Sequence, residues 1–458
     1  MAWLNLWAAR EFGEDVAEAT TNVMSTYGML AARCKYELLD PTIYSSVNYN
    51  ESARVLAEWQ SLVNNAQAVY VQLDTATQTA FFELVLHPCM AGHIVHEIHL
   101  TAGMQNTYAY EWRQSANKLA QDVLEFFGED AALTKRYHSL LNGKWNHILD
   151  QTHIGYNWWQ QPMRNVLPSL WYIQPSEISL CGPLGVTAEG TNGSAPGDSI
   201  YNPVNSDSTQ IMPPIDPPSS GTLHANGVSD QRILFSVDWS AAPAGSTVVN
   251  INVTNSNDNY GSFDMPVAQL PVNHTSVPDT FSGFVESDAH ISIEAEHTTS
   301  NTSSAGVAYG IIPAYGRTLS GVTLFPVTAP SQSAPDGPKL SYAFYAFTPA
   351  PLANITVYMG TSLNTIPDRP LRYAIAIDDE TPQVIQPVPD YTLGALPEMW
   401  YTGVANSVFT NTTSHKVGKG EHRLDLWALE PGVVFQKVVV DLGGVRESYL
   451  GPPESMRV

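Results

Sequence analysis

The spacing of apolar residues changes once along this chain, and that change limits the folds open to it. Up to about residue 172, apolar residues recur at three- and four-residue steps, as in VLAEWQSLVNNAQAV. From Gln231 onward they alternate with polar residues, as in STVVNINVT and ANITVYMG. The first spacing places apolar side chains on one face of a helix, and the second places them on one face of a strand. We therefore predict an α + β multidomain protein, in which an N-terminal antiparallel helical bundle (1–172) precedes a β-sandwich.

The helix limits of the bundle are predicted from capping and breaking residues. A long helix is expected after Asn50, Asp74 is expected to cap the next helix, and Pro88 is expected to break or kink it. Two further amphipathic stretches are predicted to end at Gly128 and at 142–143, an Asn-Gly pair. The residues expected to lie on the apolar face of the long helix are Val55, Trp59, Leu62, Ala66, Val69 and Leu73.

The β part divides into a short and a long segment. Residues 173–226 are rich in Pro, Gly and Ser, which indicates a linker or a loop-rich connection. Residues 227–285 hold only about three or four strand-like runs, too few for a closed sandwich of about seven strands. We predict an incomplete immunoglobulin-like piece there, with exposed sheet edges that favour self-association, including a homodimer. Residues 286–458 are long enough for a jelly-roll sandwich of the kind found in carbohydrate-binding modules.

Composition excludes several classes of partner. The chain of 458 residues has 21 Lys and Arg against 44 Asp and Glu, a formal net charge of −23. This charge argues against nucleic acids and against anionic membrane surfaces as partners. Three cysteines, Cys34, Cys89 and Cys181, allow at most one disulfide and match no zinc pattern, so we expect buried free thiols.

Glycosylation sequons and the N-terminal residues give opposite indications of location. The run MAWLNLWAAREFGEDV has no basic leader, no long apolar region and no small-residue cleavage site, so it is not a signal peptide. Sequons suit a secreted protein, so we expect this chain to be part of a longer extracellular protein. Asn50 also starts a sequon, but its expected position as a helix N-cap argues against glycosylation there. The glycosylation candidates are Asn192, Asn252, Asn273, Asn301, Asn354 and Asn411.

A histidine-rich stretch, HPCMAGHIVHEIHL, allows a metal interpretation and a packing interpretation. The zinc-protease pattern H-E-x-x-H requires histidine where Leu100 stands. On a helix His93 and His99 point in different directions, so the histidines cannot converge on one ion without other ligands. We favour packed histidines and predict no metal site.

The stretch KWNHILDQTHIGYNWWQQP concentrates histidines, a carboxylate and aromatic rings at the end of the bundle. An acid–base pair with an orienting carboxylate needs such residue types within hydrogen-bond reach, but no serine or cysteine nucleophile stands out nearby. Three interpretations remain: an interface with another domain, which we favour, packing inside the bundle, and contact with a ligand or substrate rim. The residues concerned are Trp145, His147, Asp150, His153, Tyr156, Trp158 and Trp159.

Two features of the β part have a functional and an ordinary interpretation. The acidic run 378–380 in IAIDDE is either a solvated loop, which we favour, or a calcium site. Aromatic residues at predicted loops or strand ends, namely Tyr315, Trp400 and Tyr401, form either a sugar-binding platform or part of the core.

Several runs resemble the C-terminal half of the glycoside hydrolase family 115 xylan α-1,2-glucuronidases, in the same order and over nearly the whole chain. They are LWAAREFG, NYNESARVLAEWQSLV, RYHSLLNGKWNHILDQTHIGYNWWQQPMRNVLP, VDWSAAPAG, GFVESDAHISIEAEH, YGRTLSGVTLFPVT, RPLRYAIAIDDETPQVIQPVP and EPGVVFQKVVVDLGGVRESYLGPPES. The resemblance implies an inverting enzyme that removes 4-O-methylglucuronic acid from plant cell-wall glucuronoxylan without an organic cofactor. In that family a (β/α)₈ barrel with the catalytic residues precedes the helical bundle, so no catalytic residue is carried over to this chain.

The resemblance also has one departure. The runs PPIDP and PSSGTL abut here, whereas the family pattern separates them by a few strands. This agrees with the strand shortage in residues 227–285.

Because the resemblance places the catalytic residues in a barrel ahead of the bundle, we expect a fragment that is inert alone and that pairs with a catalytic barrel. The alternative is a non-catalytic accessory protein that binds polysaccharide, and a third hypothesis is an independent hydrolase that uses Asp150.

Overall fold

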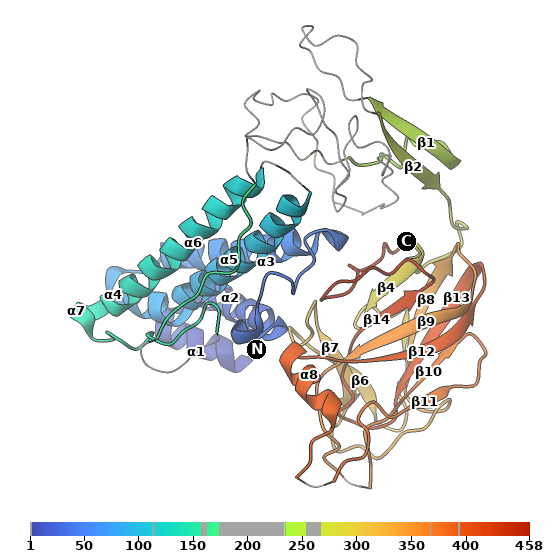
Figure 1. The fold of residues 1–458 in the computed structure, drawn as a ribbon. Helices are drawn as coiled ribbons and strands as arrows, with labels where there is room; N and C mark the ends of the chain where they lie inside the picture. The colour runs from blue at the N-terminus through green and yellow to red at the C-terminus, as the bar shows by residue number, and fades with distance from the viewer. Residues whose placement is uncertain are drawn as a thin grey trace, which may run out of the picture. The chain divides into compact units, whose positions relative to one another are not determined.

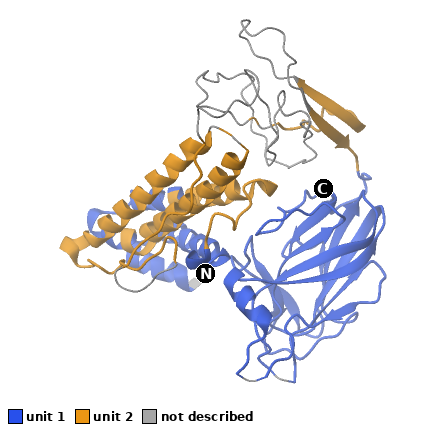
Figure 2. Ribbon diagram, in the orientation of Figure 1, with its two compact units in different colours: residues 1–38, 64–81, 277–458 blue, residues 39–63, 82–276 orange. Residues whose placement is uncertain are grey.

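The computed structural model describes residues 2–458 except 112, 114, 157–162, 174–232, 234, 253–266, 367 and 393. The described chain forms two compact units, shown in separate colours in Figure 2. Unit 1 comprises residues 1–38, 64–81 and 277–458, and unit 2 comprises residues 39–63 and 82–276. Within the described part, no helix is both long enough and apolar enough to cross a membrane. The domain limits expected from the sequence stay predictions.

The helices of unit 1 are α1 (Ala2–Phe12), α2 (Glu14–Arg33), η1 (Tyr36–Leu38), the end of α3 (Glu51–Tyr70) and α4 (Thr75–Phe81). Gly13 joins α1 to α2 with φ of 103°, a left-handed conformation that favours glycine. The ring of Phe12 packs edge-on against Phe81, with centroids 5.1 Å apart. The predicted cap of α4 is confirmed, because Asp74 Oδ1 accepts hydrogen bonds from the backbone N–H groups of Ala76 (2.9 Å) and Thr77 (3.1 Å).

The apolar spacing of α3 predicted its buried face correctly. Five of the six residues named from the sequence are each at most 2% exposed: Val55, Trp59, Leu62, Ala66 and Val69. The sixth, Leu73, lies beyond the end of α3 at Tyr70 and is half-buried, so the helix is shorter than expected. Residues at i, i+3, i+4 and i+7 lie on one side of a helix, so one stripe is buried.

Unit 2 contains η2 (Asn48–Asn50), the first part of α3, the π-helical turn η3 (Phe82–Leu86), α5 (His87–Tyr110), α6 (Ser115–His138) and α7 (Leu140–Gly143). A short connection joins α5 to α6, and the two helices lie side by side (Figure 1). The predicted end at Gly128 is wrong, because α6 continues through it. Gly128 is exposed, and a glycine inside a helix costs only about 1 kcal/mol relative to alanine.

Pro88 follows an interruption of the α-helix, since α4 ends at Phe81 and the π-helical turn η3 separates it from α5, in agreement with the expected break or kink. It lies in the first turn of α5, directly after the wide turn η3. The first N–H groups of a helix have no intrahelical acceptor, so the missing N–H of proline costs little there. The predicted end near 142–143 is confirmed, since Asn142 and Gly143 have φ of 59° and 82°.

A two-stranded antiparallel sheet also belongs to unit 2. Strands β1 (Gly245–Asn252) and β2 (Val267–His274) pair in register from Gly245–His274 to Asn252–Val267. Val248 and Val249 of β1 are 54% and 43% exposed. The incompleteness of the sandwich predicted for residues 227–285, and its self-association, remain predictions.

Unit 1 also contains the β-sandwich, whose strands are drawn from yellow to red in Figure 1. One sheet has the order β11-β10-β13-β8-β3, with β5 also paired to β8. The other sheet has the order β12-β9-β14-β7-β6, with β4 also paired to β14. The bounds are β3 (Phe284–Val285), β4 (His290–Glu294), β5 (Ser300–Asn301), β6 (Ala308–Ile312), β7 (Gly321–Phe325), β8 (Leu340–Ala346), β9 (Ala350–Met359), β10 (Tyr373–Ile377), β11 (Gln383–Ile385), α8 (Glu398–Asn406), β12 (Phe409–Val417), β13 (Gly420–Ala428) and β14 (Phe435–Asp441). The predicted fold class, a helical region followed by β-sandwich structure, is confirmed.

Strand alternation places the sandwich core between the sheets. On β8, Leu340, Tyr342 and Phe344 point into the core and are fully buried, while Ser341 and Ala343 belong to the outer face. Strand β14 departs from this pattern, because every residue from Phe435 to Val440 is buried. Both faces of β14 are therefore covered.

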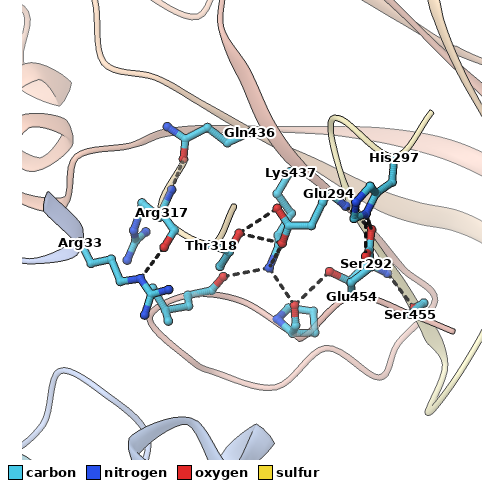
Figure 3. Close-up of polar contacts among 12 residues, drawn as sticks. Arg33, Ser292, Glu294, His297, Arg317, Thr318, Gln436, Lys437, Glu454 and Ser455 are labelled. Carbon is cyan, nitrogen blue, oxygen red and sulfur yellow. Dashed lines mark hydrogen bonds and ion pairs between the residues drawn. The ribbon is translucent and has the colours of Figure 1, made fainter. Parts of the chain in front are cut away.

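Figure 3 shows the polar contacts on the outer face of β14. Lys437 and Glu294 are 2% and 6% exposed, and their Nζ and Oε1 atoms lie 3.3 Å apart. Lys437 Nζ donates to the carbonyl of Pro452 at 3.0 Å, and Thr318 Oγ1 donates to the Glu294 carboxylate at 2.7 and 2.9 Å. Glu454 Oε1 accepts from the backbone N–H of Glu294 at 2.9 Å. The C-terminal residues thus cover β14 and complete the hydrogen bonds of a buried ion pair.

The same region holds helix α2 to the sandwich within unit 1. Arg33, the last residue of α2, is 1% exposed, and its Nε donates to the Arg317 carbonyl at 2.5 Å. Tyr449 Oη donates to the Arg33 carbonyl at 2.8 Å, and the Arg317 guanidinium lies 4.0 Å from the centroid of the Tyr449 ring. The two hydrogen bonds of Arg33 join residues far apart in the chain, since Arg33 is 284 positions from Arg317 and 416 positions from Tyr449.

Glu294→Gln is expected to lower the free energy of unfolding of the full chain by roughly 3 kcal/mol. The substitution keeps the size of the side chain but leaves the buried Lys437 ammonium without its carboxylate, and losing one partner of a buried ion pair typically costs about this much. Guanidinium denaturation followed by near-ultraviolet circular dichroism measures the change. Glu421→Gln, at an exposed glutamate of the same unit, is the control and should stay within about 0.5 kcal/mol of wild type. Equal effects of the two variants would contradict this role for Glu294.

His99 gives unit 2 a dependence on pH. It is 3% exposed on α5, and neither ring nitrogen has a hydrogen-bond partner among the described residues. Burial lowers the pKa of His99 to about 4, with the charge of Asp40 acting weakly in the opposite direction. Between pH 6.5 and about 4 the unfolded chain therefore binds more protons at this position than the folded chain, so stability is lost as the pH falls through this range.

His99→Leu is expected to flatten this pH dependence. The apolar side chain cannot take up a proton. The slope of the free energy of unfolding against pH, between pH 6.5 and 4.5, should therefore fall by up to about 1.4 kcal/mol per pH unit, the value for uptake of one proton. Denaturation midpoints followed at the helical circular dichroism band measure this slope. A variant with the wild-type slope would show that His99 is not the group that takes up the proton.

Candidate functional site

The histidine-rich end of the bundle forms two separate acid–histidine pairs. His147 Nδ1 lies 2.7 Å from Asp150 Oδ2, and both side chains are exposed, at 76% and 47%. His153 does not join this pair. Its Nε2 lies 2.8 and 2.9 Å from the two carboxylate oxygens of Asp130, whose side chain is 5% exposed. The structure therefore does not unite His147, Asp150 and His153 in one acid–base site.

Asp130 is the partner that the sequence analysis missed. It lies on α6, three and seven residues before the buried Leu133 and Tyr137, so it occupies the apolar stripe of that helix. A carboxylate on the apolar face of a helix needs a partner, and this position in the sequence could have identified Asp130. Burial lowers the pKa of His153, but the hydrogen bond and the charge of Asp130 outweigh burial and raise that pKa above its ordinary value.

The described part of segment 144–173 is hydrogen-bonded back onto the bundle. Gln105 Nε2 donates to the Trp171 carbonyl, and Trp171 N donates to Gln105 Oε1 at 3.1 Å. Asn117 binds Ile173 in the same reciprocal way, at 2.8 and 2.9 Å. Asn165 Oδ1 accepts from the backbone N–H of His153 at 2.9 Å. These amide pairs hold the backbone at Trp171 and Ile173 against α5 and α6.

The same segment exposes aromatic and aliphatic side chains. Trp145 is half-buried, with the Lys144 ammonium 4.5 Å from its ring centroid, and Gln151 Nε2 donates to Tyr156 Oη at 3.2 Å. Trp158 and Trp159 lie outside the described residues. The large apolar side chains exposed in and next to the segment are Leu141 (55%), Ile148 (57%), Trp171 (52%) and Tyr172 (59%).

The ring of Tyr315 packs against two glycines, Gly321 and Gly360. A Cβ atom placed on Gly321 would come within 2.7 Å of the Tyr315 ring, and one placed on Gly360 would come within 2.8 Å of it. Side chains at these two positions would therefore displace the ring. Tyr315 is nevertheless 45% exposed, so the ring is supported on one side and accessible on another.

The other two predicted platform residues lie on α8. Trp400 is half-buried against Phe409, with ring centroids 6.2 Å apart and an interplanar angle of 60°. Tyr401 is 66% exposed. Tyr315 and Tyr401 thus offer accessible rings, whereas much of Trp400 packs against the sandwich.

The acidic run 378–380 is engaged in local hydrogen bonds. Asp378 Oδ1 accepts from Arg423 N at 2.8 Å, and Asp378 Oδ2 lies 2.8 Å from His422 Nδ1. Glu380 Oε2 lies 2.7 Å from His415 Nδ1. The part of the chain that the structure describes contains no group of three or more His, Cys, Asp or Glu residues arranged to hold a metal ion.

The histidines of α5 are packed, which is the interpretation that we favoured from the sequence. His93, His96 and His99 are 8%, 1% and 3% exposed, and the His96 ring lies 4.7 Å from the ring of Trp59. Burial lowers the pKa of His93 and raises the pKa of the Cys89 thiol to about 12. Cys34 and Cys89 are buried free thiols, and Cys181 lies outside the described residues.

The glycosylation candidates differ in exposure. Asn273, Asn301 and Asn354 are exposed on strands, whereas Asn411 is half-buried and accepts a hydrogen bond from Tyr373 Oη at 3.1 Å. Asn252 ends β1, and Asn192 lies outside the described residues. Their modification remains a prediction.

Comparison with known proteins identifies the family of the sandwich. Residues 283–454 match the model of the glycosyl hydrolase family 115 C-terminal domain. The sandwich region is therefore similar to the C-terminal domain of glycosyl hydrolase family 115, in agreement with the resemblance seen in the sequence. No curated protein matches the chain.

Among solved structures, the chain is similar to BtGH115A, described as a novel family GH115 4-O-methyl-α-glucuronidase with specificity for decorated arabinogalactans. The TM-score is 0.52 at 15% identity, and the match covers 95% of this chain and 41% of that enzyme. The chain thus spans about two fifths of the length of that relative, and this level of identity shows the fold.

Shorter matches involve carbohydrate-binding modules. One is the C-terminal family 6 module of LamC from Zobellia galactanivorans, with 12% identity, a TM-score of 0.23, and coverage of 33% of this chain and 98% of the module. Another is a family 35 module from Clostridium thermocellum, with 11% identity, a TM-score of 0.23, and coverage of 33% and 97%.

Proposed function

We propose that this chain is the non-catalytic C-terminal part of a secreted α-glucuronidase that removes 4-O-methylglucuronic acid from glucuronoxylan. The match of residues 283–454 to the family 115 C-terminal domain carries this proposal. The fold similarity to a 4-O-methyl-α-glucuronidase over 95% of the chain supports it. That relative is described as specific for decorated arabinogalactans, so its polysaccharide differs from the one proposed here. What the proposal takes from it is the removal of 4-O-methylglucuronic acid. Xylan as the backbone rests on the sequence resemblance.

In this proposal the hydrolytic groups belong to a catalytic barrel, and segment 144–173 meets that barrel. An inverting glycosidase places two carboxyl groups roughly 6.5–9.5 Å apart across the scissile bond. Asp130 and Asp150 are instead paired with His153 and His147. The exposed rings of Trp171 and Tyr172 give the segment apolar surface suited to a protein interface.

The chain alone is expected to release no methylglucuronic acid from glucuronoxylan, and to co-purify with a co-expressed family 115 barrel. Tyr172→Ala should weaken this association at least tenfold, because burying an aromatic side chain contributes roughly 1.5–3 kcal/mol and a factor of ten corresponds to about 1.4 kcal/mol. Tyr110→Ala is the matched control, since Tyr110 of α5 is 58% exposed and Tyr172 is 59% exposed. The measurements are uronic acid release and the dissociation constant of the pair.

Two results would contradict this assignment. Release of uronic acid by the purified chain, abolished by Asp150→Ala, would show an independent hydrolase. Equal loss of barrel binding in Tyr172→Ala and Tyr110→Ala would show that segment 144–173 is not the interface.

A second candidate function is polysaccharide binding by the sandwich as an accessory module. The supported, accessible ring of Tyr315 favours it, because a flat ring fixed against the backbone can stack on a pyranose at little cost in conformational entropy. This activity is compatible with the first proposal, since a binding site near a catalytic partner raises the local concentration of substrate.

Tyr315→Ala is therefore expected to weaken binding of the full chain to glucuronoxylan about five- to tenfold in affinity gel electrophoresis. This corresponds to roughly 1–1.4 kcal/mol, the contribution expected from one stacked ring. Tyr401→Ala tests the second accessible ring, and Tyr110→Ala, in unit 2, is the control. Unchanged retardation of Tyr315→Ala would exclude Tyr315 as a platform.

A further inference from the structure

An open cleft of about 510 Å³ lies on the outer face of the sheet that contains β8 and β13. Its floor includes Ser341 and Ala343 of β8 and Arg423 of β13, where Ala343 and Arg423 are register partners. The lining also includes Phe281, Ser300, Asp378 and His422. The volume is within the range of about 300–1,000 Å³ typical of ligand pockets.

Small residues create the cleft. The outward residue of β8 at its centre is alanine, and a larger side chain at 343 would occupy the space. Gly283 allows the adjacent wall to approach β8, because a Cβ there would lie 2.4 Å from the Ala343 carbonyl and 2.7 Å from the Phe281 ring. Phe281 itself packs edge-on against Tyr345, with centroids 5.6 Å apart. The cleft therefore has one aromatic wall that is fixed by its neighbours.

Hydrogen bonds, several of them to the buried carboxylate of Asp425, fix the charged groups of the cleft. Asp425 is 2% exposed, and its carboxylate accepts from Ser341 Oγ at 2.5 Å, Lys339 Nζ at 2.8 Å and Arg423 Nε at 3.1 Å. Arg423 Nη2 also donates to the Asp378 carbonyl at 2.9 Å. The side chain of Arg423 remains 48% exposed and that of Asp378 remains 45% exposed. Two planar polar groups are thus held rigidly with part of their surface open to a ligand.

The charge balance of the cleft disfavours an anionic ligand. Arg423 already faces the carboxylates of Asp425 (3.1 Å) and Asp379 (3.8 Å). Asp378 and Glu421 add two more carboxylates to the lining, and the chain has a net charge of −23. A bound metal ion is disfavoured too, since the described residues hold no cluster of three metal-ligating side chains.

We propose that this cleft binds a short, neutral segment of a pyranose backbone. Guanidinium, carboxylate and hydroxyl groups provide the mixed donors and acceptors that vicinal sugar hydroxyls require, and Phe281 provides an apolar wall. The lining residues of the cleft do not include Tyr315. Because the carboxylates of the lining repel a uronic acid, the cleft would hold undecorated backbone, and uronic-acid branches would remain outside it. Only the choice of xylan as the probe depends on the proposed function.

The test is isothermal titration calorimetry of the full chain with xylohexaose, a neutral ligand. Ala343→Leu fills the floor of the cleft and should weaken binding at least tenfold. Ala308→Leu, at an exposed alanine of β6, is the matched control and should bind as wild type does. Ser300→Leu, at an exposed position of the wall, repeats the test if Ala343→Leu is not folded.

A second titration tests the ligand class. Xylohexaose carrying one methylglucuronosyl branch should bind no more tightly than the neutral ligand, and Glu421→Gln should improve binding of the branched ligand relative to the neutral one. Tighter binding of the branched ligand by wild type would overturn the assignment of a neutral ligand.

The outcomes separate the cleft from the proposed function. Full binding by Ala343→Leu together with loss in Tyr315→Ala would overturn the cleft and leave the platform. Loss in Ala343→Leu with full binding by Tyr315→Ala would support the cleft. Absence of any heat with wild type would overturn the cleft, while barrel association and uronic acid release would still decide the proposed function.

Discussion

The buried pair of Lys437 and Glu294 is the constraint on which the arrangement of unit 1 depends. Two charged groups inside a protein are stable only when each has hydrogen-bond partners, and the C-terminal residues supply several of them: the Pro452 carbonyl for Lys437, and Glu454 for the backbone of Glu294. The C-terminal residues must therefore lie across β14. That path places Tyr449 beside Arg317 and Arg33, so the same residues that complete the ion pair hold α2 to the sandwich.

This constraint gives the two sheets different roles. The sheet of β14 is covered on its outer side, which explains why β14 is buried on both faces. The sheet of β8 and β13 is covered near Trp427, whose Nε1 donates to the Pro335 carbonyl at 3.2 Å, and is open where Ala343 and Arg423 lie. A rigid outer face that is only partly covered suits a binding site, because few groups need to be ordered when the ligand arrives.

The sequence predicted the elements that depend on local pattern and missed those that depend on distant partners. The buried stripe of α3 and the cap at Asp74 follow from residues a few positions apart, and both were predicted correctly. Gly128 was misread as a helix end, because a glycine inside a helix costs only about 1 kcal/mol and α6 continues through it. Asp130, Asp425 and Lys437 could not be assigned partners, since those partners lie 23, 84 and 143 residues away: His153, Ser341 and Glu294.

The hydrogen bonds of segment 144–173 determine how its surface can act. A loop that folds only on contact loses affinity through the entropy of ordering. Here Gln105 and Asn117 fix the backbone at Trp171 and Ile173, so the exposed rings of Trp171 and Tyr172 are already held in place. A partner gains the burial of those rings without first ordering their backbone. In the described part of the segment, His147 pairs with Asp150 and His153 pairs with Asp130 of α6, so these catalytic residue types do not converge on one site.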